Sequence, residues 1–511
     1  MKNKGPFSGS PRFVACDPQP DTWANTHGRS GKVRFTQDNS LNMSRFSRFT
    51  SSLIASPAGR IIARPWLDTC TLYLLKNWYF PLSRLWAGAR AADGDVDRFI
   101  ECVPLEQPNK AQRKVIASAL RQFERARLKA FSIEQLWHSY FFGEDSVPEE
   151  RLPIVEEMRL DFRTAYNMTR KKFAPLRSLV KTSVSMNPPT PGDVAVRFGK
   201  NGEKLQKYLA PPGQFPDVEI SRTIPTSHGR DYWLRFPSPN QQMNDLVYAR
   251  VHEPEDVDNP PTLIFGHGIC VEFDHYHQII DEVTQLTQWG IRVIRPEAPW
   301  HGRRVLPGHY GGEQFLSKIP ISMFDFIIAQ HQEWATIINW CRRNSSGPVA
   351  IGGSSLGAQS AKAIVMSATG WPEALRPDAL LAITHSQHMA EAAQDGALSD
   401  IWNLGDSLRA VGWTQDLEKS WLQRLDPVQA ACIEGERIVT VCGTEDTVTP
   451  IPSALAQMDA WNVPQENRFT YKRGHFSIPL GLINNDEPLL KFAAVIKKIE
   501  LQNLTMTSKR K

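Results

Sequence analysis

Val349-Ala-Ile-Gly-Gly-Ser-Ser-Leu-Gly357 is the stretch that decides how the rest of the chain is interpreted. A short apolar run leads into serines flanked by glycines, and an alanine-rich pattern at helical spacing follows as far as Ala368. Strand, glycine-flanked serine and helix in this order predict a nucleophile elbow, a sharp turn that raises a serine hydroxyl above the edge of a sheet. Because strand and helix pass very close together there, the residues two before and two after the serine must be small.

This size requirement selects one of two adjacent serines. With Ser355 at the turn, the flanking residues are Gly353 and Gly357, whereas with Ser354 one of them would be Leu356, which is too bulky. Ser355 is therefore the predicted nucleophile. Taken alone, the motif is also compatible with an ordinary turn rich in glycine and serine, so the interpretation depends on the other groups that the chemistry requires.

A serine hydroxyl is a weak nucleophile and needs a base, usually a histidine, which is oriented in turn by a carboxylate. In an elbow-type enzyme the acid and then the histidine follow the serine along the chain. Asp446 follows a predicted strand at 437–442, and His475 follows another at 468–471. The carboxyl ends of parallel strands face one crevice of an open sheet. We therefore interpret Ser355 as nucleophile, Asp446 as acid and His475 as base.

Each partner also has an ordinary structural explanation, since an aspartate can cap a loop and a lone histidine can lie at the surface. The order along the chain and the position after successive strands favour catalysis. Glu445, which directly precedes the preferred acid, remains an alternative, as do Asp395 and Asp400, which follow the preceding strand.

The segment Thr262-Leu-Ile-Phe-Gly-His-Gly-Ile269 predicts a strand that runs into a His-Gly turn. Glycine in such a turn lets backbone amides face the negative charge that develops on the substrate oxygen, and each such donor contributes about 3 kcal/mol to transition-state stabilisation. We expect one donor to be the amide of Leu356 and the other that of Ile269, with Gly268 as the alternative. His267 precedes the serine, so we expect it to be a structural residue of the turn.

Four segments together resemble the α/β-hydrolase superfamily over residues 217–500: the turn HGI, the elbow GGSSLG, the acid loop GTEDTVTP and the histidine loop GHFS. The segment from Pro296 to Arg304 resembles the P-x-H/Y-G-x-R stretch of the dienelactone-hydrolase-like and domain-containing-protein-18-like branches. The resemblance implies an α/β-hydrolase fold with a mainly parallel central sheet, a small-molecule ester as substrate, and neither a metal nor an organic cofactor. The chain departs from the superfamily pattern in its long helical N-terminal half and in an insertion at 387–436.

The spacing of apolar residues along the chain changes from region to region and divides it into parts. We predict a disordered basic tail at 1–45, a helical region at 46–190, a hydrolase domain at 191–500 with a helical cap insertion at 387–436, and a tail at 501–511. The predicted strands lie at 231–236, 245–252, 262–265, 291–295, 349–351, 379–384, 437–442 and 468–471. The predicted helices between them lie at 276–289, 322–342, 358–368, 453–461 and 487–499. This alternation predicts right-handed βαβ units.

Length and composition are those of an ordinary globular protein, with 511 residues, 41% hydrophobic and 22% charged, and a net charge of +5. The small charge and the lack of a basic stripe interleaved with aromatic residues exclude a nucleic-acid partner. Seven scattered cysteines form no C-x-x-C pair, which favours reduced thiols and a cytoplasmic location. No apolar run is long enough for an integral membrane segment. A basic N-terminus leaves organelle targeting or peripheral contact with a membrane surface open.

Two further polar clusters lie near the predicted site. His301, Arg303 and Arg304 follow a strand at the same sheet edge, where they could bind an anionic group of a substrate or tie the loop to neighbouring acids; the sequence does not separate these readings. The run Asp274-His-Tyr-His277 has metal-ligand residue types, but no second cluster supports it, and a polar helix start explains it better.

The leading hypothesis is a serine hydrolase that cleaves a carboxylic ester through an acyl-enzyme. An acyltransferase or a thioesterase remains open, because the same triad and the same acyl-enzyme serve all three reactions. A third hypothesis is a non-catalytic hydrolase-fold binding protein whose helical half docks to a partner or a membrane. Acyl group, alcohol and oligomeric state are not determined by the sequence.

Overall fold

The computed structural model describes residues 64–144, 146–200, 202–271, 283–425 and 430–510. The predicted basic tail at 1–45 and the polar run at 274–277 lie outside the described residues, and so does the first half, 276–282, of the helix predicted at 276–289.

The first part of the described chain is helical, as predicted. One long helix dominates it and starts with a capping box, in which Asn109 and Gln112 each bind the backbone amide of the other. The elements are α3 (Pro65–Leu74), the π-helix η1 (Leu75–Tyr79), α4 (Phe80–Ala92), α5 (Val96–Cys102), α6 (Lys110–Phe142), α7 (Arg151–Met168), the 3₁₀ segment η2 (Thr169–Leu179), α8 (Pro191–Phe198) and α9 (Leu205–Tyr208).

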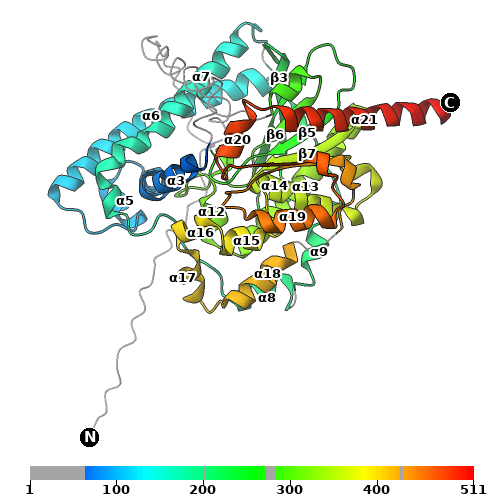
Figure 1. Ribbon diagram of the computed structural model, residues 1–511. Coiled ribbons are helices and arrows are strands. Elements are labelled where there is room, and N and C mark those ends of the chain that lie inside the picture. The colour runs from blue at the N-terminus through cyan, green and yellow to red at the C-terminus, as the bar shows by residue number, and fades with distance from the viewer. Residues whose placement is uncertain (1–63, 145, 201, 272–282, 426–429, 511) are drawn as a thin grey trace.

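A sheet of ten strands, counted within the described residues, forms the centre of the molecule (Figure 1). Its strands are β1 (Glu219–Ile220), β2 (Ile224–Thr226), β3 (Gly229–Pro237), β4 (Leu246–Pro254), β5 (Thr262–Gly266), β6 (Arg292–Pro296), β7 (Val349–Ser354), β8 (Leu380–Ile383), β9 (Ile438–Gly443) and β10 (Arg468–Tyr471). Every predicted strand is present, and β1 and β2 are two short additions.

The strand order is β1-β3-β4-β6-β5-β7-β8-β9-β10, with β2 paired to β3. The first four strands are antiparallel to their neighbours, and all pairings from β6 to β10 are parallel. A mainly parallel sheet in this order, with a sharp turn from β7 into a helix, is the α/β-hydrolase fold. The predicted fold class is confirmed.

Helices cover both faces of the sheet because successive strand residues point to opposite sides. In β7, Val349 and Ile351 pack on one side against α13 (Ile321–Asn344), α14 (Leu356–Ser367) and α19 (Ile451–Ala460). Ala350 packs on the other side against the layer of α20 (Ser477–Leu482) and α21 (Glu487–Arg510). The remaining short elements are α11 (Gln285–Gln288), η3 (Gly302–Arg304), α12 (Glu313–Ser317), η4 (Ala368–Gly370), η5 (Glu373–Leu375), η7 (Gly435–Arg437) and η8 (Gln465–Asn467).

The segment between β8 and β9, where we expect a helical cap insertion at 387–436, consists of short helices. It forms α15 (Met389–Gln394), α16 (Ala397–Trp402), α17 (Leu404–Arg409), α18 (Gln415–Leu422) and η6 (Gln423–Leu425). These helices and the N-terminal helices contribute to one apolar core, in which the rings of Phe80 and Trp402 lie 5.3 Å apart. The N-terminal helices therefore share a core with the insertion and with α12, α13 and α14, whereas the two main cores on the faces of the sheet contain no residue of 64–190.

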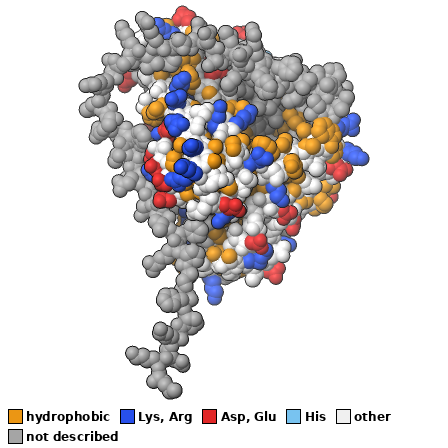
Figure 2. Space-filling model, turned by 90° about the vertical axis from the view of Figure 1, so that its left-hand side faces the viewer, with side chains coloured by type: hydrophobic (Ala, Val, Ile, Leu, Met, Phe, Trp, Pro, Cys, Tyr) orange, Lys and Arg blue, Asp and Glu red, His pale blue; other side chains and the backbone are white. Residues whose placement is uncertain are grey.

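The last helix differs from its prediction. Helix α21 continues from Glu487 to Arg510, through most of the segment expected to be a tail, because no glycine or proline interrupts the chain after Ile499. Figure 1 shows it extending beyond the body of the molecule. No helix in the described ranges combines the length and the apolarity needed to span a bilayer. On the face where α5 and α6 lie, basic and acidic side chains alternate with apolar ones (Figure 2).

Candidate active site

Ser355 lies in the sharp turn between β7 and α14, with φ 56° and ψ −116°. The two predicted flanking glycines are sterically required. A Cβ added to Gly353 would lie 2.2 Å from the carbonyl carbon of Gly357, and one added to Gly357 would lie 2.2 Å from the oxygen of Gly266. Strand, elbow and helix therefore touch backbone to backbone, which raises the Ser355 side chain at the carboxyl edge of the sheet.

The structure brings the three predicted side chains together. The Nε2 atom of His475 lies 2.9 Å from Oγ of Ser355, and its Nδ1 atom lies 2.9 Å from Oδ2 of Asp446. The serine and the histidine are 120 residues apart in the chain, and the histidine and the aspartate 29. The imidazole is 6% exposed and the aspartate 8%, so little water competes with these hydrogen bonds.

Asp446 is held as a charged acceptor by its own loop. Oδ1 accepts the amides of Val448 and Thr449 at 2.8 Å, and Oδ2 accepts the Thr449 hydroxyl at 2.8 Å. Burial by itself would raise the pKa of this carboxyl, but the proximity of His475 and the hydrogen bonds from Thr449 outweigh burial and lower the pKa. The acid therefore stays ionised and can hold the histidine in one orientation. Thr449 was not singled out from the sequence.

The turn after β5 lies against Ser355. A Cβ on Gly268 would approach the Cβ of Ser355 to 3.6 Å. Leu356 is the first residue of α14, and the first amides of a helix have no partner within it. Of the predicted donors, Leu356 directly follows the serine at the start of α14; in the turn after β5 it is Gly268, the alternative donor next to Ile269, that lies against Ser355.

Two histidines brace this turn. His267 accepts the amide of Ala298 at Nε2 and donates from Nδ1 to the oxygen of Gly268, and burial lowers its pKa to about 4. This matches its expected structural role. The Nε2 atom of His301 accepts the amide of Cys270 at 3.1 Å, while its Nδ1 donates to the oxygen of Pro299.

Arg303 and Arg304 form ion pairs with acidic side chains. Arg303 is paired with Glu134 of α6 and with Glu297. Arg304 is 4% exposed and is paired with Asp245 and Glu333. These pairs and the hydrogen bonds of His301 favour the second of the two readings of this segment, in which it ties the loop to its neighbours. We therefore assign no substrate contact to His301, Arg303 or Arg304.

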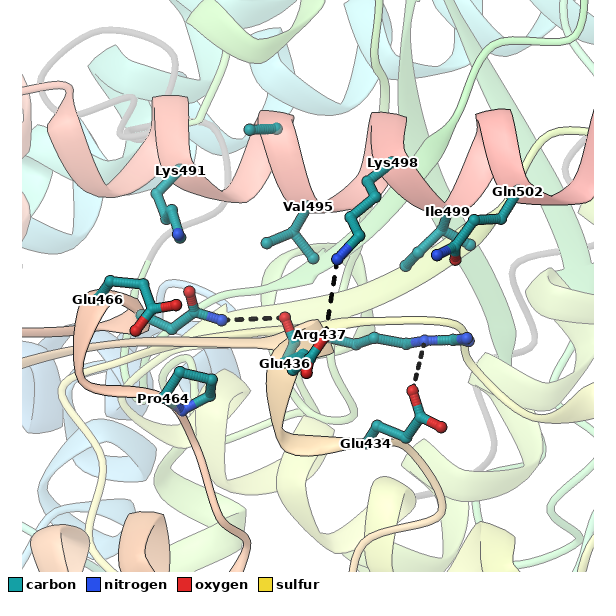
Figure 3. Close-up of a pocket in the computed structure, with 12 residues that line it drawn as sticks. Glu434, Glu436, Arg437, Pro464, Glu466, Lys491, Val495, Lys498, Ile499 and Gln502 are labelled. Carbon is teal, nitrogen blue, oxygen red and sulfur yellow. Dashed lines mark hydrogen bonds and ion pairs between the residues drawn. The ribbon is translucent and has the colours of Figure 1, made fainter.

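Figure 3 shows a surface pocket beneath α21. It lies away from the loops of Asp446 and His475. Its lining includes Lys498, which faces Glu436 at 3.6 Å, and Arg437, which faces Glu434 at 3.6 Å. The lining residues in η7 and η8 come before the start of β9 and β10. The loops of Asp446 and His475 instead follow the carboxyl ends of these two strands. The pocket is therefore at the opposite edge of the sheet. Among the described residues, no group of three or more His, Cys, Asp or Glu side chains could hold a metal.

No sequence-family model matches the chain, and no curated protein does. Among solved structures, acetyl xylan esterase 1 from a Thermoanaerobacterium species is 13% identical over 58% of this chain and 96% of that one, with a TM-score of 0.38. A hyperthermophilic esterase from Pyrobaculum calidifontis is 16% identical over 61% and 92%, with a TM-score of 0.33. A cold-adapted esterase from an Arctic intertidal metagenomic library is 13% identical over 55% and 97%, with a TM-score of 0.34. Because these values are low, we draw nothing about function from them, and the fold assignment rests on the strand order.

Proposed function

We propose that the protein is a serine hydrolase that cleaves carboxylic esters through an acyl-enzyme. The observation that carries the proposal is the continuous hydrogen-bonded chain from Ser355 through His475 to Asp446, with 2.9 Å at each step. A hydroxyl, an imidazole and an ionised carboxylate in this sequence are what nucleophilic acyl transfer needs.

In the proposed reaction, Oγ of Ser355 attacks the ester carbonyl while Nε2 of His475 takes the hydroxyl proton. Asp446 accepts the Nδ1 proton, keeps the imidazole in the correct tautomer and stabilises the imidazolium that forms. The amides of Leu356 and Ile269 bind the oxyanion. The histidine then gives its proton to the leaving alcohol, and water, activated by the same histidine, releases the acid from the acyl-enzyme.

The test is the activity of Ser355→Ala. We expect kcat for short p-nitrophenyl esters to fall by about 10⁴-fold or more, with loss of covalent labelling by a fluorophosphonate probe, because the attacking atom is gone. Ser354→Ala is the matched control, since the adjacent serine is at the end of β7 rather than at the turn; it should retain labelling and turnover.

Labelling of Ser355→Ala at the wild-type rate would remove this serine from the mechanism. Wild-type protein that is folded but neither hydrolyses esters nor reacts with the probe would refute the proposal as a whole. If the wild type is active, product analysis with added alcohols or acyl-CoA tells whether water is the preferred acceptor.

A further inference from the structure

The one buried residue of helix α3 is an acid. Asp68 is 6% exposed, whereas Trp66, Tyr73 and Leu74 on the same helix are 53%, 65% and 54% exposed. An isolated carboxylate is costly to bury and a helix that only covered a surface would turn an apolar side chain inward. The contacts of Asp68 should therefore explain its position.

Asp68 binds the loop that carries His475. Its Oδ1 accepts the amide of Phe476 at 2.6 Å and that of Ser477 at 3.4 Å, and its Oδ2 accepts the Ser477 hydroxyl at 2.6 Å. The same hydroxyl oxygen accepts the amide of Gly474 at 2.9 Å. Backbone groups on both sides of the histidine are thus tied, directly or through Ser477, to one carboxylate that lies 408 residues away from Phe476 in the chain.

The histidine loop packs tightly against Asp68. A Cβ added to Gly474 would lie 2.4 Å from the carboxyl carbon of Asp68. Within the described ranges Asp68 has no ion-pair partner, so backbone amides and one hydroxyl of the histidine loop stabilise its charge. The orientation of that loop and the burial of the acid are therefore coupled.

A second residue of the same N-terminal segment binds the turn after β5 that carries the proposed oxyanion donor Ile269. We call this turn the oxyanion turn. Tyr79, the last residue of η1, donates its hydroxyl to the oxygen of Cys270 at 2.9 Å. Cys270 directly follows Ile269 and has a positive φ of 59°, which is strained for a residue with a side chain. His301 accepts the Cys270 amide, so both backbone groups of this residue, its N–H and its carbonyl oxygen, are hydrogen-bonded.

We propose that Asp68 and Tyr79 are positioning residues for ester hydrolysis: the segment 65–79 holds the histidine loop with one and the oxyanion turn with the other. This inference rests on the proposed function. With Asp68 and Tyr79 in these roles, the helical N-terminal region is part of the catalytic apparatus rather than an appended domain. A displacement of about 1 Å in a reacting group can lower the rate roughly 100-fold, so contacts outside the substrate site can control kcat.

The central experiment compares kcat and KM for Asp68→Asn and Ser477→Ala, each normalised to sites titrated with the fluorophosphonate probe. Asp68→Asn preserves size but places an amide N–H₂ where a carboxylate accepted hydrogen bonds. We expect kcat per titrated site to fall roughly 10- to 100-fold with KM nearly unchanged. Ser477→Ala deletes one hydroxyl, and we expect a smaller fall in kcat because the amide contacts of Asp68 remain.

Tyr79→Phe removes only the hydroxyl at the oxyanion turn. We expect a fall in kcat, with KM nearly unchanged, because the carbonyl oxygen of the strained residue Cys270 loses the hydrogen bond from Tyr79. The matched control is Asp97→Asn, an acid of the same helical region that is paired with Arg113 at the surface. It should leave kcat, KM and labelling rate at wild-type values.

A purely structural role predicts a different result: fewer titratable sites or a lower melting temperature, but wild-type kcat at each site. That result for both Asp68→Asn and Ser477→Ala would overturn the role of Asp68, and wild-type kcat in Tyr79→Phe would overturn that of Tyr79. If Asp68→Asn does not fold, Ser477→Ala decides for Asp68. Failure of the proposed function is separate, because wild-type protein would then lack Ser355-dependent turnover.

Discussion

The backbone of Ser355 has a positive φ that residues with a side chain rarely adopt, at a cost of about 1–3 kcal/mol. Gly353 and Gly357 make the turn possible because each lies against backbone atoms that leave no room for a methyl group. The strain is local, and it presents the hydroxyl to His475 at hydrogen-bond distance. At this scale the geometry of the site depends on which positions lack a side chain.

A glycine substitution tests this point. Gly357→Ala would place its Cβ 2.2 Å from the oxygen of Gly266, so β5 and α14 must move apart. We expect the free energy of unfolding to fall by about 3 kcal/mol or more, with loss of the proposed esterase activity. Gly370→Ala is the control, since a Cβ there meets nothing within 4 Å. Urea unfolding of both variants provides the measurement, and equal stability of the two would contradict the close backbone contact.

At the scale of single elements, helix α6 is fastened to the sheet by an aromatic cluster. Trp137 is fully buried and packs against Phe141 with ring centroids 4.9 Å apart and against Trp233 of β3 with centroids 5.2 Å apart. The guanidinium of Arg303 lies 4.9 Å from the Trp137 ring centroid. The aromatic-rich segment 131–142 is therefore a packing surface between the helical region and the sheet.

Trp137→Ala tests how much this aromatic contact contributes to the free energy of unfolding. We expect a loss of about 3–5 kcal/mol in the free energy of unfolding, because a large buried ring is replaced by a cavity. Leu128→Ala on the same helix removes a side chain that is 59% exposed and should change stability by no more than about 0.5 kcal/mol. The prediction is wrong if chemical denaturation gives similar losses for the two variants.

Across the whole molecule, several histidines are buried in neutral form. Burial lowers the pKa of His267 and of His331 to about 4. His331 donates from Nδ1 to the oxygen of Ile327 and pairs with the Ser367 hydroxyl through Nε2. In the unfolded chain the same residues take up a proton below about pH 6.5. Between these pH values the unfolded state binds more protons, so stability falls as the pH is lowered.

The expected size of this effect at pH 5, relative to pH 7, is a loss of about 2 kcal/mol for each of these two histidines. His331→Gln should therefore show a pH dependence about 2 kcal/mol weaker than the wild type over this interval. Unfolding by urea at both pH values measures the difference. An unchanged pH dependence in the variant would show that His331 is not neutral in the folded chain.

Much of the fold was predictable because its signals are periodic and local. The apolar runs of β5, β7 and β9 are buried on both sides, which is typical of parallel strands between two helical layers. The order of Ser355, Asp446 and His475 after successive strands placed the three candidate residues at one sheet edge. The short strands β1 and β2 were missed, because strands of two and three residues carry too little pattern to detect.

What the amino-acid sequence determined by itself is the elbow, the alternation of strands and helices, and the residue types at the ends of those strands, since each depends on neighbours within a few positions. Only the tertiary structure decided that Arg303 and Arg304 pair with acids, that Thr449 supports Asp446, and that the N-terminal helices reach the histidine loop and the oxyanion turn. The physical reason is that a hydrogen-bond partner is selected by packing. Asp68 contacts a loop 408 residues away, and no local pattern specifies which buried donor an isolated acid will meet.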